Sequence, residues 1–280
     1  MREVNVSCIR EAVKELCIKA NYFLGEDIRQ ALKDSKDKET WNLAEDILDK
    51  IIINSEIADK EHMPMCQDTG MACVFVELGQ DVHLIGGNLS EAINEGVKRG
   101  YEEGFLRKSV VNDPLRRINT NDNTPAVIYY DIVPGNKIKI TVAPKGFGSE
   151  NMSKIAMLKP SDGVDGVKKF ILEVIKQAGP NPCPPMVIGV GIGGTFDKAA
   201  YLAKKALLRP INVRNNDEYY KELEIELLEK VNKLGIGPQG FGGRTTALGL
   251  NIEIYPTHIA GLPVAVNINC HATRHKEIII

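Results

Sequence analysis

The sequence lacks an excess of charge of either sign and lacks any long apolar run. Its 35 lysines and arginines nearly balance 37 aspartates and glutamates, which leaves a net charge of −2 over 280 residues. Nucleic acids and anionic membranes select basic surfaces, so we expect neither as a partner. No stretch approaches the roughly 20 apolar residues of a transmembrane helix, and the charged N-terminus has no secretory segment. We therefore expect a cytoplasmic protein, in which disulfides are rare.

Closely spaced cysteine pairs are also missing. The six cysteines include no C-x₂₋₄-C pair of the kind that structural zinc sites use, and no tight run of the ferredoxin type. Cys8 and Cys17 fall within a predicted helix and Cys73 within a predicted strand. We expect these three to be small buried side chains, because a free thiol behaves as a small hydrophobic group.

The other three cysteines stand in stiff or polar segments far apart in the sequence. Cys66 precedes the polar turn 67–70, Cys183 is enclosed by prolines at 182, 184 and 185, and Cys270 is followed by His271. Prolines exclude a helix interior and remove strand hydrogen-bond donors, so the Cys183 loop is rigid. Three thiolates that converge in a fold would form a metal centre with one coordination position left for substrate.

Two kinds of metal centre fit this pattern. Zinc would take His258 or His271 as its fourth ligand. A [4Fe–4S] cluster held by three dispersed cysteines, with one iron that has no cysteine ligand, fits at least as well. A non-enzymatic metal-binding scaffold subunit is the alternative from another functional class.

The periodicity of apolar residues predicts strands alternating with helices. We expect an α/β fold, a single domain with mixed β-sheets, one or two in number, flanked by helices. A long first helix is predicted over about 7–33, and a β-hairpin over 126–133 and 137–143 around Pro134-Gly135-Asn136. The other predicted helices are 38–58, 88–106, 162–178, 195–208 and 217–234, and the other strands are 72–78, 186–191, 246–255 and 262–268.

One glycine-rich segment suggests a different class of enzyme. Residues 189–194 match G-x-G-x-x-G between a predicted strand and helix, as in dinucleotide-binding oxidoreductases. The acidic residue expected about 20 positions later is absent before Asp217. Close packing of strand against helix explains the glycines, so we expect no nicotinamide cofactor.

Several motifs together resemble a known family along essentially the whole chain. The motifs are Cys66-Gln67-Asp68-Thr69-Gly70, Leu106-Arg107-Lys108-Ser109, Asn119-Thr120 with Asn123-Thr124-Pro125, Lys145 to Asn151, Cys183-Pro184-Pro185, Gly235 to Gly240, and Asn269-Cys270-His271-Ala272. With these motifs the sequence is similar to the α subunit of two-subunit class I fumarate hydratases, iron–sulfur hydro-lyases whose relatives include L(+)-tartrate dehydratase.

The resemblance implies a [4Fe–4S] cluster with one iron that no cysteine ligates, and a dicarboxylate substrate. The metal ligands that the resemblance implies are Cys66, Cys183 and Cys270. The implied catalytic residues are Asp68 and His258. The implied substrate-binding residues are Gln67, Arg107, Gly146 and Gly148. His271 and Arg274 could support Cys270.

Each of these side chains also has an ordinary structural explanation. Asp68 could bond only its own turn, Arg107 could be a solvated charge at a helix end, and His258 could fill a turn.

The resemblance also implies a partner. The chain stops ten residues after Cys270, whereas single-chain relatives continue into a second catalytic domain. We expect residues 1–280 to be the α-type domain, inactive alone, with the C-terminal-type domain on a separate, smaller β subunit in an α₂β₂ assembly. The expected reaction is the reversible hydration of fumarate to (S)-malate, and the alternative is L(+)-tartrate dehydration or a related hydro-lyase reaction on another dicarboxylate, such as a methylated one.

Overall fold

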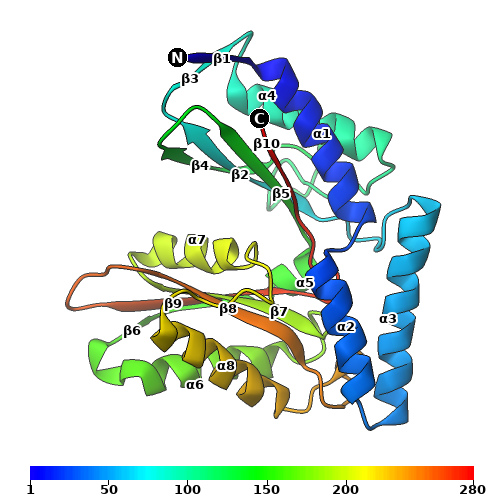
Figure 1. Ribbon diagram of the computed structural model, residues 1–280, viewed down its shortest axis with the longest axis vertical. Helices are drawn as coiled ribbons and strands as arrows, with labels where there is room; N and C mark the ends of the chain where they lie inside the picture. The colour runs from blue at the N-terminus through cyan, green and yellow to red at the C-terminus, as the bar shows by residue number, and fades with distance from the viewer. The chain divides into compact units, whose positions relative to one another are not determined.

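The computed structural model describes residues 1–280 as two compact units (Figure 1). Unit 1 comprises Met1–Leu24, Asn54–Phe147 and Arg274–Ile280, and unit 2 comprises Gly25–Ile53 and Gly148–Thr273. Both contain helices packed on mixed sheets, so the predicted α/β class is confirmed. There are three sheets, two four-stranded and one two-stranded. No helix is long and apolar enough to cross a membrane.

Unit 1 is a four-stranded sheet covered on one face by two helices. Its elements are β1 (Arg2–Asn5), α1 (Val6–Tyr22), β2 (Met71–Gly79), β3 (Val82–Ile85), α4 (Leu89–Glu103), β4 (Val127–Val133), β5 (Ile138–Lys145) and β10 (Lys276–Ile279). The strand order is β10-β5-β2-β4, and β1 pairs with β3 separately. Alternate residues of β2 and β5, such as Val74 and Ile140, pack against Val13 of α1 and Val97 of α4.

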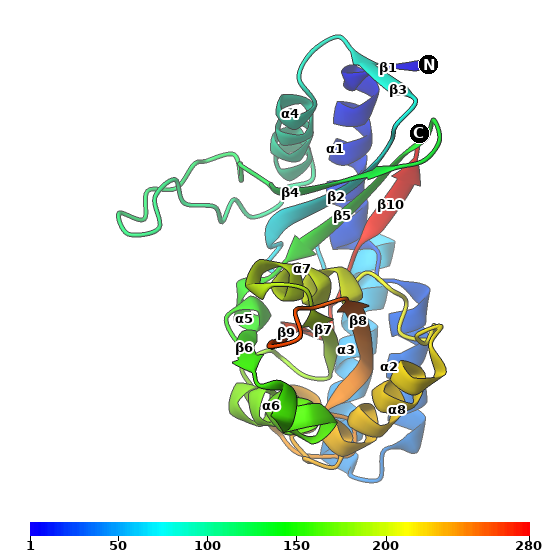
Figure 2. The same cartoon turned by 90° about the vertical axis from the view of Figure 1, so that its left-hand side faces the viewer.

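Two glycines let α1 and α4 lie side by side (Figure 2). A Cβ atom on Gly96 would stand 2.6 Å from the carbonyl oxygen of Arg10, and one on Gly100 would stand 2.9 Å from that of Lys14. Both distances are shorter than a real Cβ tolerates. The helix pair is therefore packed through its backbones, and it forms a rigid support for the ends of β2 and β5.

Unit 2 is a four-stranded sheet with helices on both faces. Its elements are α2 (Glu26–Lys38), β6 (Lys154–Leu158), η1 (Pro160–Asp162), α6 (Gly163–Ala178), β7 (Met186–Gly193), α7 (Phe196–Ala206), α8 (Glu218–Asn232), η2 (Pro238–Gly240), β8 (Ala247–Tyr255) and β9 (Leu262–Asn269). The order is β6-β9-β7-β8. In Figure 1, α7 covers one face of the sheet, and α6 and α8 cover the other. Two further helices, α3 (Asn42–Glu61) and α5 (Phe147–Glu150), each begin in one unit and end in the other.

The glycines of segment 189–194 serve packing between strand and helix. A Cβ atom on Gly189 or Gly191 would stand 2.1 Å from a backbone oxygen of α7, that of Ala203 or Ala199 respectively. These glycines therefore allow α7 to approach β7. The packing explanation of the G-x-G-x-x-G match is confirmed at these two positions.

The predicted hairpin over 126–143 is wrong. Strands β4 and β5 do not pair with each other, because β2 lies between them, parallel to β4 and antiparallel to β5. The turn after β4 bonds instead to the end of β2: the amides of Gly79, Gln80 and Asp81 donate to carbonyls of residues 137, 133 and 135. A Pro-Gly-Asn turn indicates a reversal of the chain, but it does not say whether a third strand is inserted.

The predicted long first helix is also wrong. It is divided into α1 and α2, because Phe23 caps α1 in an extended conformation and Gly25 is the N-cap of α2. The apolar spacing continues across the break, with Leu24 and Ile28 both buried. Glycine lowers helix stability by about 1 kcal/mol relative to alanine, and here it marks the boundary between two helices.

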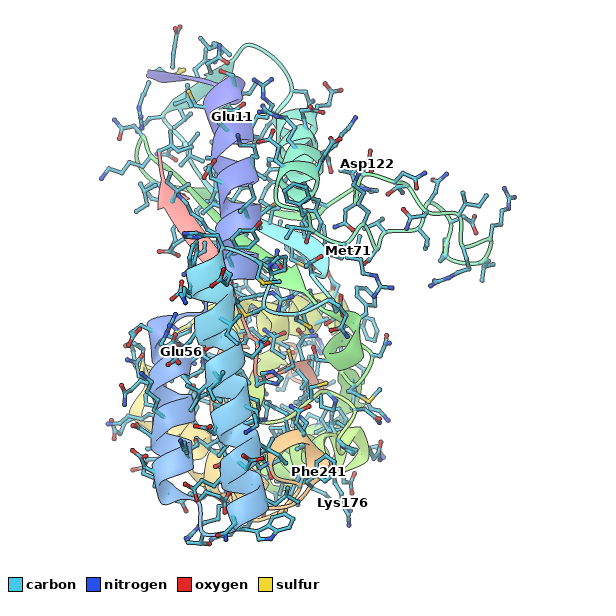
Figure 3. All side chains as sticks on the ribbon, turned by 90° about the vertical axis from the view of Figure 1, so that its right-hand side faces the viewer. Glu11, Glu56, Met71, Asp122, Lys176 and Phe241 are labelled. Atoms are coloured by element: carbon cyan, nitrogen blue, oxygen red, sulfur yellow. The ribbon has the colours of Figure 1, made fainter.

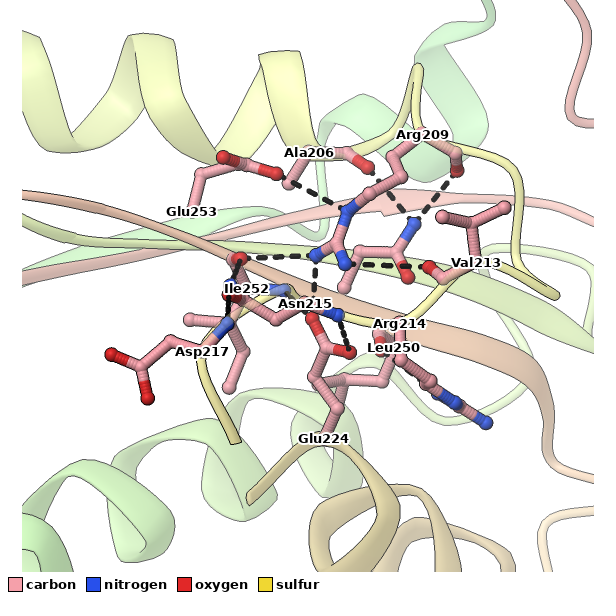
Figure 4. Close-up of polar contacts among 11 residues, drawn as sticks. Ala206, Arg209, Val213, Arg214, Asn215, Asp217, Glu224, Leu250, Ile252 and Glu253 are labelled. Atoms are coloured by element: carbon pink, nitrogen blue, oxygen red, sulfur yellow. Dashed lines mark hydrogen bonds and ion pairs between the residues drawn. The ribbon is translucent and has the colours of Figure 1, made fainter. Parts of the chain in front are cut away.

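A buried ion pair anchors the connection between α7 and α8 (Figure 4). Glu224 is completely buried, and Arg209 donates to its carboxylate and to the carbonyl of Ile252, the latter at 3.0 Å. Glu224 also accepts the amide of Ile252 at 2.8 Å and that of Asn215 at 3.1 Å. These bonds join the 207–217 connection to β8. Buried charges are stable only when paired and hydrogen-bonded in this way.

Candidate metal and substrate site

The register of unit 2 brings two of the predicted ligand loops together. Val187 near the start of β7 pairs with Asn269 at the end of antiparallel β9. Cys183 lies just before β7 and Cys270 just after β9, so the two loops leave the sheet at the same end. The backbone amide of His271 donates to the carbonyl of Cys183 at 3.3 Å, and His271 Nδ1 lies 3.0 Å from the same oxygen. His271 thus links the loops of Cys183 and Cys270.

A third loop fixes this pair. Gln239 donates its backbone amide to the carbonyl of Pro184 at 2.7 Å and its side-chain Nε2 to the same oxygen at 3.0 Å. Its Nε2 also lies 3.2 Å from His271 Nδ1. Gln239 and Cys183 both have positive φ angles, 52° and 54°, a conformation that non-glycine residues adopt rarely. Several hydrogen bonds therefore hold the Cys183 loop in one shape.

The turn after Cys66 is organised in unit 1 around the carboxylate of Asp68. Asp68 Oδ1 accepts the amide of Gly70 at 3.1 Å, and Oδ2 accepts the amide of Phe147 at 2.9 Å. The guanidinium of Arg274 donates to the backbone carbonyl of Asp68. Gly70 has φ +75°, and a Cβ there would lie 2.7 Å from the carbonyl carbon of Lys145. Only glycine lets this turn rest on the end of β5.

The segment of Arg107 is bound to the same turn. Thr69 Oγ1 donates to the carbonyl of Arg107 at 3.1 Å. The hydroxyl of Tyr101 is 2.8 Å from the carbonyl of Thr69 and 3.0 Å from that of Gly70. Burial raises the pKa of Tyr101 well above its usual value, so the hydroxyl keeps the proton that these contacts need. The side chain of Arg107 itself is exposed.

Asn123 joins the Arg107 segment to the Asp68 turn. Its side chain is completely buried. Its Oδ1 accepts the amides of Ser109 at 2.7 Å and Val110 at 3.2 Å, and its Nδ2 donates to the carbonyl of Gly70 at 3.2 Å. Three of the four hydrogen-bonding capacities of this amide are used between two segments that carry predicted site residues. Sequence reasoning noticed the Asn-Thr-Pro motif but assigned Asn123 no role.

The resemblance implies that the backbone around Gly146 and Gly148 forms a cradle for a substrate carboxylate, but these two glycines belong to different units. Gly146 lies in unit 1, where a Cβ would stand 3.0 Å from Asp68 Oδ2, so glycine leaves room for the bond between Asp68 and Phe147. Gly148 is exposed in unit 2. Glu150, two residues on, bonds Lys204 and accepts Asn267 Nδ2 at 2.7 Å, which ties this turn to β9 and α7. The cradle stays a prediction.

The β8–β9 connection, which contains His258, lies at the other end of β9 from Cys270. His258 is exposed there, and its Nδ1 accepts the amide of Ala260 at 3.2 Å. All of β9 separates it from Cys270. At about 3.3 Å per residue an eight-residue strand spans about 25 Å. The unit does not bring His258 to Cys183 or Cys270, and its catalytic role stays a prediction.

The cysteines differ in their surroundings. Cys17 and Cys73 are buried as expected, and burial raises the pKa of the Cys17 thiol to about 12. Cys8 is exposed, so its predicted burial is wrong; it lies on the outer side of α1. Cys66 and Cys270 are half-buried and Cys183 is exposed, and all six are reduced thiols.

The bonded loops carry two of the predicted metal ligands, the exposed Cys183 and the half-buried Cys270. No group of three histidine, cysteine, aspartate or glutamate side chains has gathered in the structure. Cys66, Gln67, Asp68, Arg107, Gly146 and Arg274 belong to unit 1, and Gly148, Cys183, His258, Cys270 and His271 belong to unit 2. The three-cysteine ligand set therefore stays a prediction, supported by the pairing of two of its loops.

Comparison with known proteins decides the family. The sequence profile described as "Fumarate hydratase (Fumerase)" matches residues 10–279. The chain belongs to the fumarate hydratase family.

Relatives support this assignment over nearly the full length. A Methanocaldococcus jannaschii protein named "Putative L(+)-tartrate dehydratase subunit alpha" is 47% identical over 272 residues, which cover 95% of each chain. The L(+)-tartrate dehydratase subunits alpha of Escherichia coli O157:H7 and Shigella sonnei are each 34% identical, over 98% of this chain and 91% of theirs. The family resemblance inferred from the motifs is confirmed, and with it the hydro-lyase class.

Proposed function

We propose that this chain is the α subunit of a [4Fe–4S] fumarate hydratase that interconverts fumarate and (S)-malate. The observation that carries the proposal is that each unit organises predicted site residues into one fixed arrangement. In unit 2 the loops of Cys183 and Cys270 are bonded together. In unit 1 the turn of Asp68 and the segment of Arg107 are bonded together. Membership of the fumarate hydratase family supplies the reaction class.

Cys66, Cys183 and Cys270 would hold the cluster. When bound, it supplies a Lewis acid, an iron without a cysteine ligand that can take up the charge of the departing hydroxide. The donor set fits this role, because thiolates are the usual ligands of iron–sulfur clusters. Three ligands leave one position for the substrate.

Arg107 would bind a carboxylate of the substrate. A planar guanidinium can hold a carboxylate through two parallel hydrogen bonds, which a lysine cannot do. The backbone of Arg107 is fixed by Thr69, while its side chain is exposed and can reach a ligand. Gln67, exposed beside Cys66, would orient the same substrate by hydrogen bonding.

Asp68 would move the proton at the substrate hydroxyl. Each of its carboxylate oxygens accepts one backbone amide, from Gly70 or Phe147. A carboxylate has about four acceptor sites, so both oxygens keep capacity for a substrate proton. The two amides fix the orientation of the group before substrate binds, which is how an enzyme lowers the entropic part of a barrier.

A β subunit would complete the enzyme. The relatives above carry the name subunit alpha, and this chain covers almost all of each. The partner would hold the second carboxylate and would deliver the proton to the other carbon. We expect an α₂β₂ assembly that is inactive as α alone.

The test is hydration of fumarate by the anaerobically assembled αβ complex, followed by malate formation. The proposal expects turnover with both subunits and none with either subunit alone. A complex that contains its cluster and leaves fumarate unchanged would refute the fumarate assignment. Exposure to air should abolish turnover, because an iron open to substrate is also open to dioxygen.

A second candidate is the dehydration of L(+)-tartrate, favoured by the names of the relatives. The two candidates share the metal centre and the reaction class, and they differ in the substrate that the completed pocket accepts. The ratio of kcat/KM for (S)-malate to that for L(+)-tartrate in one preparation decides between them. A complex that binds metal and acts on neither dicarboxylate would favour the scaffold alternative.

A further inference from the structure

One segment of unit 1 stands out from the rest of the unit. Residues 108–122, called the arm below, lie in the connection between α4 and β4, which Figure 2 shows extending away from the rest of unit 1. Figure 3 shows the same excursion, with Asp122 near its base. Between residues 111 and 120 no side chain is buried. Packing against its own unit therefore does not explain why the arm is there.

The arm is nevertheless ordered by its own hydrogen bonds. Val111 and Asn119 form an antiparallel bridge, and the amide of Asn112 donates to the carbonyl of Ile118 at 2.7 Å. At the tip Asp113 Oδ1 accepts the amides of Leu115 at 2.9 Å and Arg116 at 2.6 Å. A segment that already has a fixed shape loses little conformational entropy when it binds a partner.

The tip of this ordered arm carries apolar and basic side chains. Leu115 is 90% exposed and Ile118 is 62% exposed. Arg116 and Arg117 lie between them and are also exposed. A single exposed aliphatic residue is ordinary. Two aliphatic residues and two arginines within four positions have the composition of an interface core, which is enriched in apolar residues and arginine.

The base of the arm indicates what it contacts. Both ends are fixed to the Asp68 turn, one through Arg107 and Thr69 and the other through Asn123 and Gly70. A globular partner of about 100 residues has a radius of gyration of about 13 Å. The eight residue steps from Arg107 to Leu115 span at most about 28 Å. A subunit that completes a substrate site at Arg107 would therefore lie within reach of the arm.

We propose that the arm is the docking element for the β subunit. Leu115 and Ile118 would enter an apolar depression of that subunit, and Arg116 and Arg117 would face carboxylates at its rim. This inference rests on the proposed two-subunit enzyme. It goes further by assigning the surface of this chain that binds the partner. The partner that binds the arm is the β subunit rather than a second copy of this chain. The two ends of the arm are bonded to the Asp68 turn, beside the proposed substrate site that the β subunit would complete.

The test measures association between this chain, loaded with its metal, and the separately produced β subunit. The double variant L115E/I118E should raise the dissociation constant at least tenfold, which corresponds to a loss of about 1.4 kcal/mol of binding free energy. The matched control is I132E/I279E, which places the same charges at aliphatic residues that are 76% and 59% exposed on the edge strands β4 and β10. The control should bind within twofold of the wild type.

A second variant tests the charges and guards against a folding artefact. R116E/R117E should slow association and reduce its dependence on salt, since long-range attraction of exposed charges acts mainly on the association rate. All variants should keep the wild-type thermal midpoint, because every changed side chain is exposed.

Three results would overturn the inference: L115E/I118E binding within twofold of the wild type, an equal loss in I132E/I279E, or a loss of self-association of this chain with β binding unchanged. Association is measured without turnover, so failure of the fumarate assignment is distinct from failure of the arm.

Discussion

Replacing Asn123 should disconnect the two segments that carry Arg107 and Asp68. Asn123→Ala removes the acceptor of the part-buried amide of Ser109 and the buried amide of Val110, and the donor to the carbonyl of Gly70. Each buried group left without a partner costs about 1–3 kcal/mol. Because water and local relaxation recover part of this cost, we expect unfolding to become easier by about 2–4 kcal/mol.

The effect on catalysis should exceed the effect on the amount of folded enzyme. A displacement of about 1 Å in a positioned group can cost about 100-fold in rate. We expect kcat/KM of the αβ complex to fall by about that factor, with a raised KM because Arg107 is placed to bind substrate. Asn123→Asp keeps the acceptor for both amides but sets a buried carboxylate oxygen against the carbonyl of Gly70, so its loss of stability should be at least as large as that of Asn123→Ala.

The assay is steady-state kinetics on the cluster-loaded αβ complex, together with urea unfolding of each variant. Asn136→Ala, in the exposed turn between β4 and β5, is the control and should leave both measurements unchanged. If Asn123→Ala folds and keeps kcat/KM within twofold of the wild type, the proposed link between the two segments is wrong.

Three other predictions concern the metal, the buried ion pair and the buried thiol. Serine in place of Cys66, Cys183 or Cys270 should lower the amount of iron bound by the anaerobically prepared protein. Serine in place of the exposed Cys8, which is no predicted ligand, should leave the amount of bound iron unchanged. Arg209→Met should destabilise the fold by about 3–5 kcal/mol, because Glu224 stays buried without its cation; Arg209→Met with Glu224→Leu should recover much of this loss in urea unfolding. Burial raises the pKa of the Cys17 thiol from 9.0 to about 12, so above pH 9 the unfolded chain releases a proton that the folded chain keeps. The free energy of unfolding should therefore fall between pH 9 and 12 by up to about 1.4 kcal/mol per pH unit, and Cys17→Ala should flatten this slope; an identical slope in the variant would contradict the argument.

The sequence predicts the elements of this fold better than their connections. Apolar spacing locates β2, β7, β8, β9, α4, α6 and α8 within a few residues, since periodicity depends on which face of an element is buried. It does not reveal that β2 lies between β4 and β5. It also continues across Gly25, where the structure ends one helix and starts another. Strand order depends on contacts between distant segments, which a local pattern does not contain.

The same limit applies to the site. The proline-enclosed Cys183 and the polar turn after Cys66 are visible as local signals, and they point to a metal centre. The proximity of the loops that contain Cys183 and Cys270 depends on the register between β7 and β9. The role of Asn123 depends on its hydrogen bond to the carbonyl of Gly70, which is 53 positions away in the sequence. A buried asparagine has no local signature that separates it from an exposed turn residue, so its role becomes visible only when its three partners are known.

The central claim is that three cysteines far apart in the sequence hold a [4Fe–4S] cluster at a hydro-lyase site. The most direct measurement is iron and acid-labile sulfide per chain after strictly anaerobic purification. The account predicts about four of each, both lost when Cys183 or Cys270 is replaced by serine and retained when Cys8 is replaced. Zinc in place of iron, or no metal after anaerobic reconstitution, would contradict it.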